Sequence, residues 1–202
     1  MTMIRSICVY CGSANGSDPV FTEEAVALGT AMAKSGIRLI YGGGSIGLMG
    51  ATARAVLEAG GEVTGIIPDF LKQRESLLKD VQETVIVPDM HTRKRLMFER
   101  ADAFVALPGG IGTLEELVEQ LTWSQLGRHK KPILILDTNG FWRPLLSLFA
   151  HMNLSGFIRP GLNVTYLVAE KADDIIPMLD TAARRAAGLE EEPEAAVIAE
   201  RF

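Results

Sequence analysis

A strand, a glycine-rich turn and a helix follow one another at residues 102–126, and this stretch decides the fold. Residues 108–116 read Pro-Gly-Gly-Ile-Gly-Thr-Leu-Glu-Glu, directly after the apolar run Asp-Ala-Phe-Val-Ala-Leu at residues 102–107. That run is typical of a buried strand, and residues 114–126 repeat apolar side chains at helical spacing. A helix that begins beside glycines presents unpaired backbone N–H groups and the positive end of its dipole. The stretch therefore predicts a phosphate site with a carboxylate close by.

The same residues also have the spacing of a helix cap. Thr113 and Glu116 stand three positions apart, as in a capping box. There, the Thr hydroxyl caps the helix and the Glu side chain reaches back to the Thr amide. On spacing alone, capping explains Glu116 as well as catalysis does, and both interpretations stay open at this point.

Strand-like and helix-like segments alternate along the rest of the chain. This alternation predicts an α/β fold, a Rossmann-like doubly wound parallel sheet with helices on both faces. The predicted strands are residues 7–10, 38–41, 62–67, 85–87, 103–107, 133–136 and 165–168. Residues 1–187 are expected to form a single domain, because the chain is too short for two large ones. Residues 188–202, which contain a Glu-rich run, are expected to be a flexible acidic tail.

Large apolar side chains on the predicted helices are assigned to the core or to an interface rather than to base stacking. They recur at helical spacing on apolar faces, which is typical of packing. Phe98 and Trp123 are assigned to the core or an interface. The residues assigned to the core alone, on a predicted helix over residues 141–152, are Trp142, Leu145, Leu146 and Leu148.

Composition excludes several classes of partner. The formal net charge of −5 argues against a nucleic-acid surface, which needs a clustered basic face. The first residues do not resemble a secretory signal, and no apolar stretch is long enough to span a bilayer. We therefore expect a cytoplasmic protein that contacts no membrane.

The cysteines and histidines predict no metal or redox site. Cys8 and Cys11 spell C-x-x-C, but Cys8 lies on the first predicted strand and Cys11 directly follows it, and residues three apart along a strand point to opposite faces. A redox pair belongs at the start of a helix, so both are expected to be core residues. The histidines are scattered without ligand spacing, and we predict no metal.

A second glycine-rich loop follows the second predicted strand. Gly42, Gly44 and Gly47 match the G-x-G-x-x-G fingerprint of dinucleotide sites, and Asp69 stands past the next strand where the fingerprint places an acid. A nicotinamide-dependent dehydrogenase is thus an alternative. It is a weak one, because residues 108–113 form another glycine loop that competes for phosphate. A third loop of small residues, 11–13, ends the first strand, and all three loops are expected at the carboxyl edge of the sheet.

A basic segment leads into the strand before the main glycine turn. Residues 89–95 read Asp-Met-His-Thr-Arg-Lys-Arg and precede a predicted helix that ends near residue 100. This places Arg93 and Lys94 near the same sheet edge as the glycine loops. The alternative is an ordinary solvated helix start in which Arg95 pairs with Glu99 at i,i+4 spacing.

Taken together, residues 41–50, 90–94 and 108–116 resemble the Lonely Guy family of cytokinin-activating phosphoribohydrolases. The family pattern PGGxGTxxE is filled without a departure, and the resemblance extends from residue 11 to about residue 166. It implies a cofactor-free homodimer that hydrolyses the N-glycosidic bond of N6-modified adenosine 5′-monophosphates, and AMP as a further candidate, to free base and ribose 5-phosphate. Such chains are often described as lysine decarboxylases, but no pyridoxal site accompanies Lys94.

The resemblance also implies a set of site residues. Arg93 and Glu116 correspond to the catalytic pair. The predicted substrate contacts are Glu75, Lys94, Gly110, Ile111, Gly112, Thr113, Leu114, Glu115 and Thr122, together with Ser13 and Gly44 from the other two glycine loops. After Glu75 the chain follows the family less closely.

Glycosidic cleavage through an oxocarbenium-like sugar needs a negative charge near the anomeric carbon and a means of activating water. Glu116 suits either role. Arg93 suits the stabilisation of charge on the departing purine or on the phosphate.

A non-catalytic nucleotide carrier or sensor on the same fold is the alternative of a different class. It would use the glycine loops but would have no need for the acid. Glu116 within a complete PGGxGTxxE pattern favours the enzyme.

Overall fold

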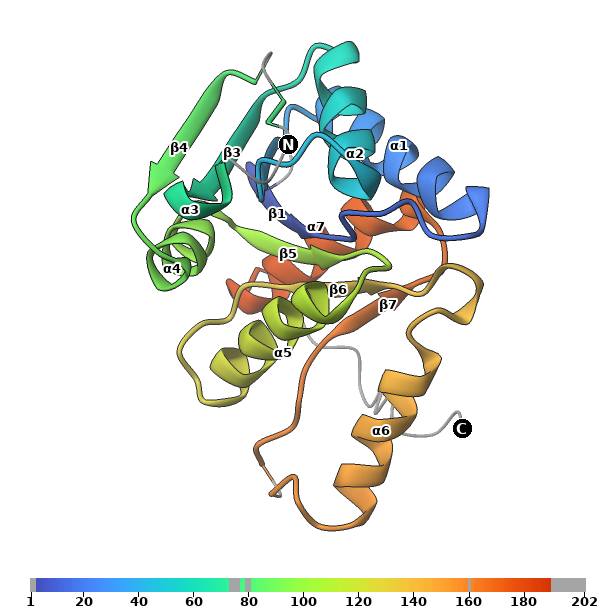
Figure 1. Ribbon diagram of the computed structural model, residues 1–202. Helices are drawn as coiled ribbons and strands as arrows, with labels where there is room; N and C mark the ends of the chain where they lie inside the picture. Colours follow the sequence, from blue (N-terminus) through green and yellow to red (C-terminus); the bar gives the residue numbers. More distant parts are fainter. Residues whose placement is uncertain (1–2, 73–76, 79–80, 160, 190–202) are drawn as a thin grey trace.

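The computed structural model describes residues 3–72, 77–78, 81–159 and 161–189. Within these residues, seven parallel strands form one sheet in the order β4-β3-β2-β1-β5-β6-β7 (Figure 1). The strands are β1 Ser6–Tyr10, β2 Arg38–Tyr41, β3 Val63–Pro68, β4 Glu83–Val87, β5 Ala103–Ala106, β6 Ile133–Leu136 and β7 Leu167–Ala169. The helices are α1 Pro19–Lys34, α2 Gly47–Glu58, α3 Asp69–Lys72, α4 Met90–Arg100, α5 Ile111–Gln125, α6 Arg143–Leu154 and α7 Ile175–Ala186. The predicted α/β fold is confirmed.

The strand order reverses between β1 and β5. The chain winds outward from β1 to β4 and then returns to place β5 against the other side of β1, pairing Ile7 with Ala103 and Tyr10 with Ala106. In doubly wound sheets, ligands bind outside the carboxyl ends of the strands at such a reversal. The fold therefore directs attention to the loops after β1 and β5.

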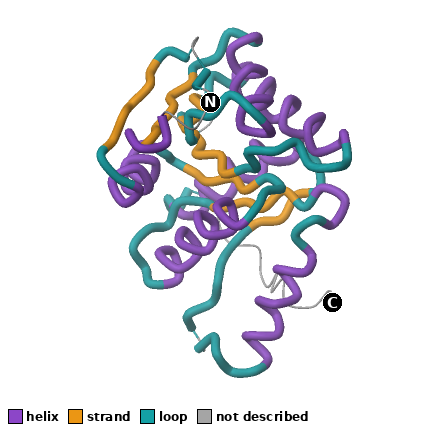
Figure 2. The backbone as a smooth tube through the Cα atoms, viewed as in Figure 1, coloured by secondary structure: helices purple, strands orange, loops and turns teal. Residues whose placement is uncertain are grey.

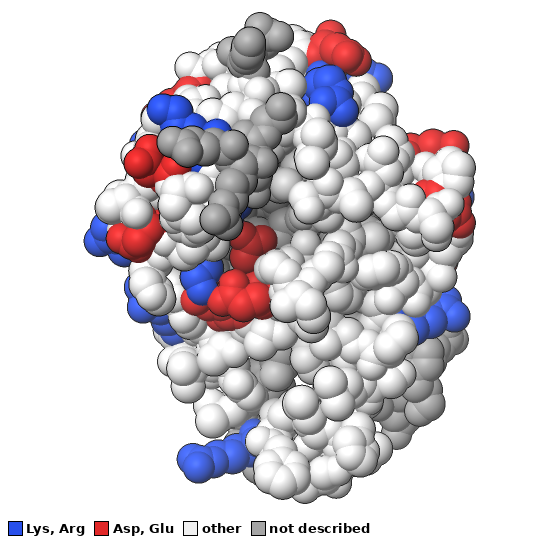
Figure 3. All heavy atoms as spheres, in the orientation of Figure 1, with Lys and Arg blue, Asp and Glu red and all other residues white. Residues whose placement is uncertain are grey.

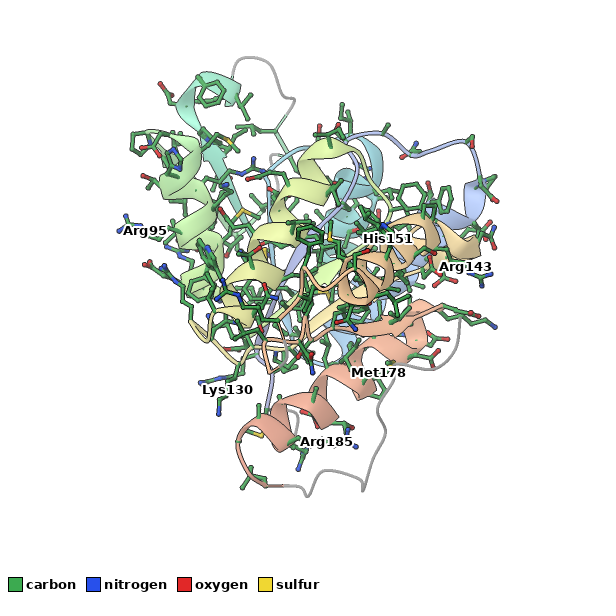
Figure 4. The ribbon with its side chains drawn as sticks, turned by 90° about the horizontal axis from the view of Figure 1, so that it is seen from below. Arg95, Lys130, Arg143, His151, Met178 and Arg185 are labelled. Carbon is green, nitrogen blue, oxygen red and sulfur yellow. The ribbon has the colours of Figure 1, made fainter. Side chains whose placement is uncertain are left out.

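Two apolar layers cover the sheet, one on each face. On one face, α1, α2 and α7 pack on Ile7 and Val9 of β1 and their neighbours. On the other, α4, α5 and α6 pack on Cys8 and Tyr10. Figure 4 shows α4, marked by Arg95, and α7, marked by Met178 and Arg185, on opposite sides of the molecule. A central strand buried on both faces explains why β1 is buried and mainly apolar from Ile7 to Tyr10 rather than alternating between apolar and polar residues.

The two cysteines lie in different layers. Cys8 is buried in the α4–α6 layer, whereas Cys11 is buried among residues of the α1–α2 layer, and both are free thiols. Burial raises the pKa of each thiol far above its ordinary value, so both are held as inert thiols. The prediction of core cysteines is confirmed.

The helices α2 and α5 begin before the apolar repeats in their sequences become visible. The observed starts are Gly47 and Ile111, whereas periodicity becomes visible only from residues 51 and 114. The first turn of each helix contains glycine, which has no side chain to register in a hydrophobic pattern. Both early starts extend helix ends toward the carboxyl edge of the sheet.

Helix α6 and the segment after it extend away from the sheet (Figures 1 and 2). Figure 4 shows Arg143 and His151 along this helix. The helix begins two residues later than predicted because Phe141 is the C-cap of a preceding 3-10 turn over Thr138–Gly140 and Trp142 is the N-cap of α6. From residue 190 on, the predicted acidic tail lies outside the described residues. None of the helices in the described ranges combines the length and apolar character needed to cross a bilayer.

Candidate active site

The loops after β1 and β5 are joined where the strand order reverses. The Gly12 N–H donates to the Pro108 carbonyl at 3.0 Å, and the Leu107 N–H donates to the Tyr10 carbonyl at 2.9 Å. These bonds continue the β1–β5 pairing past the strand ends and fix the glycine turn of residues 108–110 against the first loop. The turn is thereby held at the edge where doubly wound sheets bind ligands.

Helix α5 begins at this turn with open backbone amides. Gly110 is the N-cap residue, and the first helical hydrogen bond runs from the Leu114 N–H to the Gly110 carbonyl at 3.0 Å. The amides of Ile111, Gly112 and Thr113 therefore precede the hydrogen-bond ladder of the helix. Gly110 and Gly112 are exposed, and a Cβ atom at either would meet no heavy atom within 4 Å. This helix end can accept an anion directly on its main chain.

The capping-box interpretation of Thr113 and Glu116 is wrong. Because α5 begins at Ile111, Thr113 is the third helical residue rather than the cap, and Glu116 lies in the second turn. The Thr113 side chain is buried, 5% exposed, where a Cβ on Gly109 would overlap it. Glu116 therefore does not cap its own helix.

The Arg93 guanidinium and the Glu116 carboxylate meet beside this helix start. Helix α4 is capped by Asp89, whose carboxylate accepts from the Thr92 N–H at 2.8 Å. Arg93 follows in the first turn and points inward, where its Nε donates to the Ile66 carbonyl of β3 at 3.1 Å. Its other end lies 4.0 Å from Glu116 Oε1, and the two side chains are 10% and 14% exposed. The pair joins α4 to α5 with little access to solvent.

Burial changes the acidity of Glu116. It raises the pKa of this carboxyl from its ordinary 4.5 to about 7, although the Arg93 guanidinium opposes the shift. The negative charge of neighbouring Glu115 adds to the increase. A carboxyl that titrates near neutral pH suits proton transfer, and such perturbed groups are concentrated at functional sites.

Lys94 bridges the same two helices one residue further along α4. Its Nζ donates to Glu115 Oε1 at 2.6 Å and to Glu119 Oε1 at 2.9 Å. Burial lowers the pKa of Lys94, but its hydrogen bonds to the two carboxylates outweigh this and raise it overall. In Figure 3, acidic and basic side chains gather beside a hollow near the middle of the face. The alternative of a solvated helix start fits Arg95, which is exposed and points outward from α4 (Figure 4), but not Arg93 or Lys94.

The glycine loop after β2 does not present a second open helix end. The Leu48 N–H of α2 donates to the Ala14 carbonyl at 3.4 Å, and the Met49 N–H donates to the Gly12 carbonyl at 3.3 Å. These amides are used to attach α2 to the loop after β1. The dinucleotide fingerprint needs them for a pyrophosphate, so the dehydrogenase alternative does not fit this structure.

Three further predicted contacts differ in their surroundings. Ser13 is exposed in the loop after β1, next to the attachment of α2. Gly44 is buried and forms an antiparallel bridge with Leu77. Leu114 is half-buried and packs into the α4–α6 layer, so its side chain has a structural role.

Of the last two predicted contacts, Thr122 is not brought to the catalytic pair, and Glu75 cannot be placed in the described structure. Thr122 lies two turns beyond Glu115 on α5, where its hydroxyl donates to the Val118 carbonyl of the same helix at 2.7 Å. Glu75 lies outside the described residues.

Sequence reasoning missed Glu119 and the close packing of Gly42 on Arg93. Glu119 stands four residues after Glu115, and two carboxylates at this spacing repel unless a cation lies between them. The spacing of Glu115 and Glu119, together with the nearby Lys94, could have predicted that a cation lies between the two carboxylates. The contact of Gly42 with Arg93 joins residues far apart in the chain and leaves no local signal.

Comparison with known proteins identifies the family of this chain. A family model described as possible lysine decarboxylase matches residues 49–179. A cytokinin riboside 5′-monophosphate phosphoribohydrolase of Oryza sativa subsp. japonica is 48% identical over 176 residues, which cover 87% of this chain and 73% of that protein. A protein of the same name from Rhodococcoides fascians is 44% identical over 173 residues, covering 85% and 87% of the two chains.

Solved structures share the fold at lower identity. A molybdenum cofactor binding protein from Rippkaea orientalis is 23% identical, with a TM-score of 0.67 over 89% of this chain and 98% of that one. The molybdenum cofactor carrier protein of Chlamydomonas reinhardtii is 20% identical, with a TM-score of 0.66 over 88% and 96%. These likenesses show the Rossmann-like fold alone. The family is shown by the matched model and by the relatives that cover most of both sequences, and the chain belongs to the Lonely Guy family of cytokinin riboside 5′-monophosphate phosphoribohydrolases.

Proposed function

We propose that this protein hydrolyses the N-glycosidic bond of N6-modified adenosine 5′-monophosphates, and of AMP to a lesser extent, releasing the free base and ribose 5-phosphate. The observation that carries the proposal is the buried Arg93–Glu116 pair beside the open amino end of α5. Relatives that bear the name of this activity support it. The proposal includes a cytoplasmic location, where nucleotides are available.

The 5′-phosphate binds at the start of α5 in this proposal. The amides of Ile111, Gly112 and Thr113 point out of the helix end, and the helix dipole favours an anion there. Gly112 and Glu116 are four residues apart and so lie on one face, about 6 Å apart along the axis. That separation suits one ribose ring between the phosphate and the carboxylate. The anomeric carbon is thereby placed near Glu116.

Glu116 acts on the water and on the sugar. As a carboxylate it takes a proton from the attacking water, whose oxygen becomes bonded to the anomeric carbon. The bond from that carbon to the purine nitrogen breaks, its electron pair leaves with the base, and the base takes up a proton from solvent. Glu116 then returns the proton that it took from water to solvent, which restores the carboxylate. The same negative charge stabilises the cationic sugar while the bond is breaking. A pKa of about 7 supports both roles, because part of the enzyme holds the ionised form at neutral pH.

Arg93 acts at the leaving group rather than at the phosphate in this proposal. Its guanidinium lies 4.0 Å from the Glu116 carboxylate, one helical turn away from the amides that receive the phosphate. A fixed guanidinium in a site closed to solvent stabilises negative charge that develops on the purine. Lys94, held between Glu115 and Glu119, supplies a further cation for the nucleotide.

We also propose a homodimer formed through the apolar surface of α6 and the segment after it. We call this the α6 surface, and its exposed apolar side chains are Leu126 at the end of α5 and Leu148, Met152, Leu154, Phe157 and Leu162. Leu154 and Phe157 are 88% and 85% exposed, which is unfavourable for a monomer in water. Gln125 donates to the Leu162 carbonyl at 2.7 Å and so holds α5 next to this segment.

The proposal is tested by comparing a nucleoside monophosphate with its nucleoside. The purified protein is incubated with isopentenyladenosine 5′-monophosphate or with isopentenyladenosine, and free base is followed by chromatography. Because two or more charge-assisted bonds hold the phosphate, base release from the nucleoside should be slower by about a hundredfold or more. Equal rates of base release from the two compounds would show that the start of α5 does not bind the phosphate. Binding of the monophosphate without release would favour the non-catalytic carrier or sensor.

A further inference from the structure

The site described above leaves most glycines of the loop after β2 without an assigned role. Its fingerprint glycines suggested a phosphate cradle, yet the amides at the start of α2 donate to the carbonyls of Gly12 and Ala14. Gly47 is explained by its positive φ of 62° and by its contact with the backbone of residues 13–14. Gly42 has neither explanation, because its φ is not positive and the atoms nearest to its Cβ position belong to Arg93 and Met49.

Gly42 instead lies against the guanidinium of Arg93. A Cβ atom at Gly42 would overlap the terminal NH2 nitrogen of Arg93 and would lie 3.4 Å from its Cζ. The same atom would lie 3.3 Å from Met49 Sδ. Since the backbone of Gly42 does not itself call for glycine, the space that Arg93 occupies is what requires a residue without a side chain.

The arginine is enclosed by groups from four elements. Its Nε donates to the carbonyl of Ile66, inside β3, and Gly42, directly after β2, closes another side. Met90 of its own helix places Sδ 3.9 Å from NH1, and Glu116 of α5 lies at 4.0 Å. Arg93 is only 8% exposed, so a guanidinium displaced from this seat has no equivalent place nearby.

We propose that Gly42 is a positioning residue that seats the Arg93 guanidinium beside Glu116. The proposal rests on the proposed catalytic role of Arg93 and names a further determinant of the same site. It assigns the glycine loop after β2 to the shaping of the catalytic pair rather than to a phosphate. Any side chain at this position pushes the guanidinium away from the carboxylate, although every group that binds the phosphate stays in place.

The test is Gly42→Ala, compared with Gly60→Ala as a control. Gly60 lies at φ 78° with open space around its Cβ position, so its substitution strains the backbone without touching Arg93. A displacement of about 1 Å at a catalytic group costs about a hundredfold in rate. We expect Gly42→Ala to lower kcat by about that factor with KM changed less than about threefold. Gly60→Ala should keep the activity of the parent protein.

Two readouts distinguish seating of the arginine from a general loss of structure. Arg93 lowers the pKa of Glu116, so its displacement should move the acidic limb of the pH–rate profile to higher pH, as Arg93→Ala should. In an Arg93→Ala background, Gly42→Ala should cost little further activity and little further stability, because the group that it displaces is gone. Losses that multiply in the double variant would overturn the proposal.

The design also separates this proposal from the catalytic role of Arg93. If Arg93→Ala retains the turnover of the parent protein, the proposed catalytic role of Arg93 is wrong. The stability of the double variant then still tests whether Gly42 makes room for the Arg93 guanidinium. If Gly42→Ala alone does not fold, the double variant with Arg93→Ala must recover folding, as measured by thermal unfolding. A double variant that is as unstable as Gly42→Ala alone would overturn the seating of Arg93 by Gly42.

Discussion

The Arg93 guanidinium and the Glu116 carboxylate lie 4.0 Å apart, at the outer limit of an ion pair, and both are almost closed to solvent. A shorter pair would hold Glu116 fully ionised, and a longer one would leave two buried charges unpaired. The observed spacing leaves the pKa of Glu116 at about 7. The pair is thus poised between a stable ion pair and a reactive acid, which is consistent with a catalytic site rather than a structural bridge.

Replacing Glu116 by Gln should abolish hydrolysis while nucleotide still binds. The amide keeps the shape of the side chain but takes no proton from water and places no charge beside the sugar, so kcat should fall by about a thousandfold or more. The matched control is Glu23→Gln on the exposed side of α1, which should leave turnover unchanged. Binding is measured by isothermal titration with AMP. An active Glu116→Gln protein would show that the carboxylate has no part in the chemistry.

Replacing Arg93 by Ala should lower turnover by about a hundredfold, because the charge on the departing base loses its fixed counter-ion. Arg95, two residues along α4, is the control, since it is exposed and points outward (Figure 4). Steady-state kinetics of Arg93→Ala and Arg95→Ala, measured side by side, provide the comparison. Equal effects would mean that only the overall charge of the helix matters.

The rate should depend on the ionisation of Glu116. With a pKa of about 7 and activity in the carboxylate form, kcat/KM should fall about tenfold per pH unit below pH 7 and level off above it. The nucleotide phosphate loses its second proton near pH 6, a separate and lower transition. Initial rates from pH 5 to pH 9 with one substrate measure the profile. A flat profile across this range would contradict the assignment of Glu116 as the proton acceptor.

Glu116 should also make the fold less stable as the pH rises. Its pKa is raised from 4.5 to about 7, so between these values the folded state retains a proton that the unfolded chain has lost. Stability therefore falls through this window, by about 3 kcal/mol over its full width. Glu116→Gln, which does not ionise, should gain stability relative to the parent protein between pH 5 and pH 8. Urea unfolding at pH 5 and pH 8 gives the difference in unfolding free energy between Glu116→Gln and the parent protein. The same difference at both pH values would contradict this prediction.

The α6 surface should hold the homodimer together. A charged residue in an apolar interface is unpaired and costly to bury, so the double substitution Leu154→Asp with Phe157→Asp should produce a monomer. Leu189→Asp is the control, because Leu189 is an exposed apolar residue beyond the end of α7. Light scattering after size-exclusion chromatography gives the mass of each variant. A dimer that persists in the double variant would place the interface elsewhere.

Much of the fold followed from sequence because buried parallel strands form continuous apolar runs. Strands β1, β2 and β6 lie within a residue of their predicted bounds. The predicted start of helix α5, residue 114, lies three residues after the observed start at Ile111, because the first turn contains Gly112 and no apolar repeat. Leu148 was predicted to be core and is 45% exposed, since periodicity identifies an apolar face but not what covers it.

The candidate site was predicted in part. The motif around Glu116 and the basic run with Arg93 both led to the pair that the structure brings together. The contact of Gly42 with Arg93 was not predicted, because a glycine fingerprint has the same letters whether it holds a phosphate or makes room for a side chain. Only the tertiary contacts of the loop show whether its glycines bind a phosphate or make room for a side chain.

The central claim is tested most directly by incubating the purified protein with isopentenyladenosine 5′-monophosphate and with AMP, and following both products by chromatography. Free base and ribose 5-phosphate should appear in equal amounts, faster from the N6-modified nucleotide, and neither should appear with Glu116→Gln. Nucleotide that binds and is recovered intact would contradict hydrolysis of the glycosidic bond.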